Sequence, residues 1–257
     1  SFTMDALTAG QNVKLTTVQT TAAGGSSVNS LTLDSGGGVG GTGALTITSG
    51  GVVAKGGNAG INTTLALGAT EGIFHVLGGS TSLTVDRITG TVGVTKAGAG
   101  SMTINNIAFT GNITVNEGEL KVGTGSRIAD FSNIYVNSGG TLNLNASNLV
   151  TSFGDRNSYN TNGIFGAGAG GSITNTAATA STLYLGGTST SLFAGTIDGN
   201  VNLNLAYRSG GTYSAGAGNV IFTGGASTMT GDVTLAGWGL LLTNDASFNN
   251  AASYHIY

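Results

Sequence analysis

Apolar and polar residues alternate in short segments along most of the chain. In the segment 101–104, for example, a threonine separates Met102 from Ile104. Because successive side chains of a β-strand point to opposite faces, each segment predicts a strand with one apolar face turned inward. Glycine-rich breakers, such as Gly139 and Gly140, lie between the segments and mark turns. The predicted strands are 28–33, 44–47, 64–67, 82–85, 101–104, 112–115, 119–122, 133–136, 141–144, 182–185, 201–205, 219–222, 232–235 and 239–242.

Three architectures use many short strands: a sandwich, a closed barrel and a parallel β-solenoid. Hairpins favour two-residue Asn-Gly or Asp-Gly turns between longer strands, whereas this chain has strands of about four residues and spacers of irregular length. In a β-solenoid each inward side chain lies above its counterpart in the preceding rung. The absence of proline suits internal strands, which need every backbone N–H for pairing. We therefore expect an all-β fold, a single right-handed parallel β-helix over residues 1–257.

One motif of the chain is repeated. The stretch 94–123 returns in looser form from Gly216, so that Gly111-Asn-Ile-Thr-Val115 becomes Gly231-Asp-Val-Thr-Leu235. Internal similarity of this kind indicates a repeat architecture. The residues of the first copy expected to face inward are Met102, Ile104, Ile113, Val115, Leu120 and Val122.

The alternation breaks down between Leu149 and Ala180. This part of the chain predicts an outward loop or an irregular rung at about 149–181, because insertions in solenoids usually lie on one face. Neither end of the chain resembles a polar cap, and 251–257 stops within the pattern. We expect the chain to be part of a longer protein or of an assembled filament.

The composition excludes several classes of chemistry. Only 7% of the residues are charged, 47 are glycine and none is cysteine. Disulfides, cysteine-ligated zinc and thiol catalysis are therefore excluded. Hydrophobic residues make up 39% of the chain and alternate with polar ones, which argues against a disordered linker. Serine, threonine and asparagine take the place of charge on the predicted surface.

The net charge and the hydropathy of the chain limit the partners that we expect. The net charge is −3 and the eight basic residues are spread along the chain, so a nucleic-acid partner is not expected. No apolar run is long enough to predict a membrane span, and no signal peptide is recognised at Ser1. If the protein is exported, we expect the chain to be a mature or partial piece of it.

Few residues could carry chemistry. The pairs Asp86-Arg87 and Asp155-Arg156 are sequence neighbours, which point opposite ways in a strand, so we interpret them as loop salt bridges. Glu117 and Glu119 are interpreted as solvated turn carboxylates. The two histidines, His75 and His255, are isolated, and the two GxGxxG matches, 38–43 and 166–171, precede no predicted helix. We expect no catalytic residue, no cofactor and no metal site.

Polar side chains at strand ends suggest two further roles. Stacked asparagines can hydrogen-bond along a solenoid corner, as amide ladders do; the candidates are Asn105, Asn106, Asn116, Asn137, Asn143 and Asn145. Aromatic residues such as Tyr159, Tyr207, Tyr213 and Trp238 could instead form a surface on which sugars stack. Tyr207 and Arg208 are the candidate glycan contacts.

By these residues the chain resembles the autotransporter-associated β-strand repeats of bacterial surface proteins. That repeat reads roughly Gly-x-Gly-x-Leu-x-Leu, an Asn-Thr-Tyr-Thr-Gly-like turn, and Thr-x-Val-x-x-Gly-x-Leu. The similar residues here are Gly98, Gly100, Met102, Ile104, Ile107, Phe109 in place of the turn tyrosine, Gly111, Ile113, Val115, Gly118, Leu120 and Val122. The similarity covers about 28–145 and, more weakly, 183–245. It implies a parallel β-helix, export, a passenger or surface-fibre role and no catalytic residues.

The sequence thus favours a non-catalytic structural protein of the bacterial surface or extracellular matrix. It would be a rigid rod that associates with itself, through solenoid ends or further repeats of the same chain. One alternative is a glycan-binding adhesin or passenger domain that uses Tyr207 and Arg208. A weaker alternative is a polysaccharide-active β-helix enzyme, in which Asp155 would be required.

Overall fold

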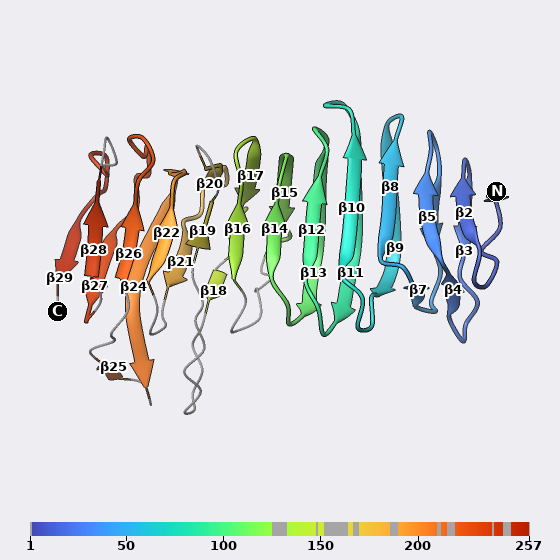
Figure 1. Ribbon diagram of the computed structural model, residues 1–257, viewed down its shortest axis with the longest axis horizontal. Helices are drawn as coiled ribbons and strands as arrows, with labels where there is room; N and C mark the ends of the chain where they lie inside the picture. The colour runs from blue at the N-terminus through green and yellow to red at the C-terminus, as the bar shows by residue number, and fades with distance from the viewer. Residues whose placement is uncertain are drawn as a thin grey trace.

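The computed structural model describes residues 2–124, 133–147, 149–151, 164–166, 170–185, 190–209, 212–214, 219–237, 239–243 and 248–256, with the backbone alone at 149–151, 164–165, 206–209 and 212–214. Every regular element in these residues is a β-strand, and none of them is helical. The strands stack side by side along a rod, with the two chain termini at its opposite ends (Figure 1). The prediction of an all-β, parallel β-solenoid is confirmed.

The first sheet runs along one side of the rod from the N-terminal end. Between the two terminal strands, each strand of this sheet pairs in parallel with a strand of the rung before it and a strand of the rung after it. In order along the sheet they are β1 (Thr3–Met4), β2 (Asn12–Leu15), β5 (Ser30–Leu33), β8 (Gly51–Lys55), β10 (Gly72–Leu77), β12 (Val94–Ala97), β14 (Ile113–Val115), β16 (Ile134–Val136) and β19 (Ile164–Phe165).

The second sheet contains long strands that bend within the rung. In β11 the exposed Asp86 and Arg87 lie between the buried Val85 and Ile88. Two successive outward residues break the alternation, so the strand turns a corner there and supplies two sides of the rung. The main path is β3 (Val18–Thr20), β6 (Gly38–Gly40), β9 (Asn58–Ala66), β11 (Ser82–Gly90), β13 (Ser101–Phe109), β15 (Gly118–Val122), β17 (Gly140–Asn143), β20 (Ser172–Asn175) and β23 (Thr196–Gly199), with β4 (Ser26–Val28) and β7 (Leu45–Ile47) beside it.

Two smaller sheets occupy the C-terminal part of the rod. One contains β18 (Leu149–Thr151), β21 (Ser181–Leu185), β24 (Val201–Ser209), β27 (Val233–Ala236) and β29 (Tyr254–Ile256); the other contains β22 (Ser191–Phe193), β26 (Asn219–Phe222) and β28 (Gly239–Leu242). A parallel bridge between Gly166 and Phe193 joins the end of the first sheet to β22. The solenoid therefore continues across the change of sheets.

Inward side chains form columns along the rod axis. In the second sheet Leu83 pairs with Met102, Met102 with Leu120, and Leu120 with Leu142, and all four side chains are buried. Nearer the C-terminal end, the ring of Phe222 meets those of Phe193 and Phe248 edge to face, with centroids 5.9 and 5.0 Å apart. The six side chains of the repeat motif predicted to face inward are all buried. The core is thus a continuous apolar column, because parallel pairing places each strand's inward residues over those of the strand before.

The two copies of the repeated motif do not occupy equivalent positions. Residues 113–115 form β14 in the first sheet, whereas 233–235 lie in β27, which pairs with β24 and β29. The similarity therefore repeats the strand and turn chemistry, but not the side of the solenoid on which the strand lies.

The described residues of the irregular segment at about 149–181 include several strands of the solenoid. Within it, β18 pairs with β21, β19 with β16, and β20 with both β17 and β23. The side chain of Ile173 in β20 is buried in the core. Residues 152–163 and 167–169 of this segment lie outside the described residues.

Candidate functional site

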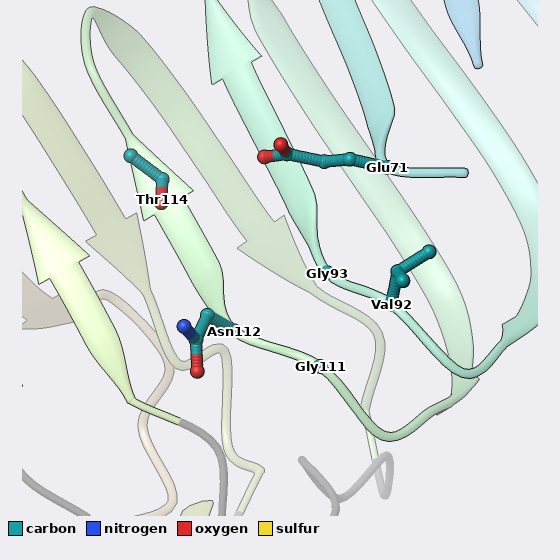
Figure 2. A pocket seen from close by; sticks show the side chains of 6 residues that line it. All are labelled: Glu71, Val92, Gly93, Gly111, Asn112 and Thr114. Carbon is teal, nitrogen blue, oxygen red and sulfur yellow. The ribbon is translucent and has the colours of Figure 1, made fainter. Parts of the chain in front are cut away.

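A hollow of about 360 Å³ opens on the surface of the rod, where the chain enters β10, β12 and β14. Its lining comes from three successive rungs (Figure 2). The lining residues are Glu71, Val92, Gly93, Gly111, Asn112 and Thr114. The volume lies near the lower end of the range typical of small-molecule pockets.

The register of the strands explains the hollow. Gly72 pairs with Val94 and Val94 with Ile113, so Glu71, Gly93 and Asn112, which precede them, follow one another along the rod. Gly93 has no side chain, and a space is left between its two neighbours. Cβ atoms added at Gly93 and Gly111 would collide with the backbone of the adjoining rung. The glycines are therefore required by the close approach of the rungs, and the hollow follows from them.

Two polar side chains of the hollow are held in place by their neighbours. The hydroxyl of Thr95 donates a hydrogen bond to Oε1 of Glu71 at 2.5 Å, and the backbone N–H of Asn133 donates to Oδ1 of Asn112 at 3.0 Å. Within the described part of the chain, no protein group pairs with the Asn112 amide nitrogen or with the Thr114 hydroxyl. Figure 2 shows the Glu71 side chain extending across β12. The hollow thus offers a carboxylate, an amide donor and a hydroxyl next to the apolar Val92.

A second polar feature, Lys96, lies in the core and does not face this hollow. The side chain of Lys96 is fully buried, and its Nζ donates to the carbonyl oxygens of Ala97, Gly98 and Glu117 at 3.2, 2.6 and 2.8 Å. Burial lowers the pKa of Lys96 from 10.5 to about 8, and the negative charges of Glu117 and Glu119 oppose this effect. Sequence reasoning missed this cation, although the alternation in 94–97 places it on the same face as the buried Val94.

Of the predicted charged pairs, Asp86-Arg87 is not a salt bridge. Both side chains are exposed at the bend of β11, where the corner turns them both outward. The ion pairs found among the described residues join Asp34 to Lys14 at 2.9 Å and to Lys55 at 3.3 Å. The loop salt bridge predicted for Asp86 and Arg87 is therefore wrong. Asp155 and Arg156 lie outside the described residues.

The turn carboxylates Glu117 and Glu119 have different surroundings. Glu117 is exposed at a bend, as predicted for a solvated turn residue. Glu119 is half-buried, and its Oε1 accepts a hydrogen bond from Nδ2 of Asn143 at 2.7 Å. The two residues therefore do not act as a matched pair of free carboxylates.

The predicted stacking of asparagines is confirmed at one corner. Nδ2 of Asn137 donates to Oδ1 of Asn116 in the preceding rung at 2.7 Å. Asn29 and Asn12 make the same contact at 2.7 Å near the N-terminal end. Asn145 instead donates to the carbonyl oxygen of Val122 at 3.0 Å, and Asn105 and Asn106 are exposed at the bend of β13.

The candidate glycan contacts lie on a protruding hairpin. At the end of β24, Tyr207 pairs with Ser214 and Arg208 with Tyr213 of β25 (Thr212–Ser214), in an antiparallel arrangement. Figure 1 shows β24 extending beyond the neighbouring strands. The side chains of these four residues lie outside the described part of the chain, as do Tyr159 and Trp238.

The histidines are not brought together. His75 faces outward from β10, and His255 lies in β29 at the C-terminal end of the rod, where it contacts the hydroxyl of Ser253 at 2.7 Å. No group of three His, Asp or Glu side chains suited to a metal ion occurs among the described residues. Of the GxGxxG matches, 38–43 begins with β6 and no helix follows it, whereas 166–171 lies partly outside the described residues.

Comparisons with known proteins found no relatives for this chain. No family model matches it, and neither a curated protein nor a solved structure does so. The described residues also contain no helix with the length and hydropathy that crossing a membrane requires. A functional conclusion therefore rests on the β-solenoid and on the geometry of its surface.

Proposed function

We propose that this chain is a non-catalytic structural protein, a rigid rod that associates end to end with further copies of itself. The observation that carries the proposal is the unbroken stack of parallel strands over a continuous apolar core, a form that further rungs of the same kind can extend. We place the rod at the bacterial surface or in the extracellular matrix, as the resemblance to autotransporter-associated repeats implies.

The apolar columns support the rigidity of the rod. Inward side chains lie over their counterparts in the adjacent rungs, and the strands inside each sheet pair with two neighbours. A solenoid of this kind owes its stability mainly to the interfaces between adjacent repeats. Bending the rod would open such an interface and expose apolar surface, which costs roughly 25 cal/mol per Å².

The end strands carry exposed apolar residues. At the N-terminal end, β1 and β3 pair on one side only, and Phe2, Met4 and Val18 are 56, 52 and 65% exposed. At the C-terminal end, the one described partner of β29 is β27, and Tyr254 and Ile256 are 53 and 77% exposed. An open strand edge with apolar side chains is a template for pairing with another chain. Addition of a second rod there would continue the sheets, and at the C-terminal end Tyr254, which pairs with the buried Val233, would also continue the core.

Electron microscopy of the purified chain tests this proposal. We expect filaments whose length grows with protein concentration. Charged residues protect strand edges from pairing, so Val18→Lys and Ile256→Lys should each stop elongation at the altered end. Ile73→Lys is the matched control, because Ile73 is 40% exposed but lies on the flank of the rod, in β10.

Dispersed single rods of the unaltered chain would refute self-association. Filaments formed equally well by both end variants would refute pairing through these edges. If Ile73→Lys alone abolished the filaments, the contact would be lateral rather than end to end.

A further inference from the structure

We propose that the hollow between β10, β12 and β14 is a binding site for a neutral carbohydrate. The site is separate from the rod ends and from the hairpin that carries Tyr207 and Arg208. Its polar groups come from Glu71, Asn112 and Thr114, and Val92 supplies an apolar wall. The inference does not depend on end-to-end association.

The hydrogen-bonding groups select the chemical class of the ligand. A carboxylate only accepts hydrogen bonds, an amide nitrogen only donates them, and a hydroxyl does both. A sugar hydroxyl can donate to Glu71 while a neighbouring hydroxyl accepts from Asn112, so a polyol matches both groups. An anionic ligand would be repelled by Glu71, and a cationic one would direct its own donors at the Asn112 amide nitrogen. A neutral polyhydroxyl ligand satisfies all three groups.

The site is already arranged for binding. The N–H of Asn133 holds Oδ1 of Asn112, which leaves the Nδ2 donor of that amide available. The Thr95 hydroxyl holds one oxygen of Glu71 and leaves the other available. Gly93 and Gly111 sit in paired rungs where added side chains would collide with backbone, so the floor of the hollow has no side chain that could close it. Groups held in the binding arrangement lose little freedom when a ligand is bound.

The size and position of the hollow suit one or two sugar units of a longer chain. Its volume is about 360 Å³, and it is open to solvent along the flank of the rod. A polysaccharide could therefore enter the site with internal residues and continue on both sides. Such a site would let the flank of a rod hold a glycan while its ends remain free.

The test is an array of neutral and charged oligosaccharides, followed by calorimetric titration of the purified chain with the strongest neutral binder. Asn112→Asp keeps the oxygen that accepts from Asn133, removes the amide donor and adds a second negative charge. Glu71→Gln keeps the acceptor for Thr95 and removes the charge. We expect each variant to bind about tenfold more weakly, which corresponds to about 1.4 kcal/mol.

Asn116→Asp is the matched control, because the Oδ1 atom of Asn116 likewise accepts a hydrogen bond from the next rung, but outside the hollow. Its affinity should equal that of the unaltered chain, and all variants should retain the circular dichroism spectrum and thermal midpoint. The site is supported if both hollow variants bind more weakly and the control does not. It is overturned if no neutral glycan binds, if only acidic or amine-bearing ligands bind, or if the hollow variants retain full affinity.

Discussion

Because Lys96 is buried, it makes the free energy of unfolding depend on pH, and the variant Lys96→Met isolates this dependence. In Lys96→Met the side chain keeps a similar length, but it loses the charge and the donors that meet the carbonyl oxygens of Ala97, Gly98 and Glu117. Other titrating groups are present in both proteins. The difference between the two free energies of unfolding therefore reports the titration of Lys96.

The direction and size of the effect follow from the pKa of Lys96, which falls from 10.5 to about 8 on folding. Between these two values the unfolded chain binds more protons than the folded one, so the contribution of Lys96 to stability rises with pH. Below pH 8 the group is protonated in both states and this contribution is constant. Across the window the unaltered chain should gain roughly 3 kcal/mol relative to Lys96→Met, at about 1.4 kcal/mol for each tenfold change in proton affinity.

Urea unfolding of both proteins, followed by circular dichroism at pH 7, 8, 9 and 10, measures this difference. The expected plot is flat up to about pH 8 and then rises in favour of the unaltered chain. A difference that stays constant over the whole range would show that Lys96 keeps an ordinary pKa, and would refute the argument from burial.

Three further substitutions test the packing of the rungs. Leu120→Ala leaves a cavity in a core column and should lower the free energy of unfolding by about 2–5 kcal/mol in urea titrations; a loss under about 1 kcal/mol would contradict tight packing. Gly93→Ala should lower the thermal midpoint because its Cβ meets backbone, whereas Gly40→Ala, with open space at that position, should not. Asn137→Ala removes the amide contact to Asn116 and should cost about 1 kcal/mol, with no change expected in the spectrum.

Much of the fold was readable from local alternation. The pattern in 101–104 and 119–122 predicts strands and identifies their inward residues, because side chains of a strand alternate with a period of two. The lack of proline and the irregular spacers favoured parallel rungs over hairpins. The inward position of Lys96 was not predicted, and the core accommodates this side chain because three carbonyl oxygens from two rungs converge on its Nζ.

Local alternation was enough to predict many of the strands and, in the repeated motif, the side chains that face inward, whereas strands such as β8 and β10 were not predicted. Only the fold shows which residues of different rungs lie beside one another. Glu71 and Asn112 flank the gap at Gly93 because strand pairing places residues from three rungs in one column, and the two copies of the repeated motif lie in different sheets. A period of two records only whether a side chain faces in or out, whereas neighbours across rungs are set by the length of each turn and by pairing between distant strands.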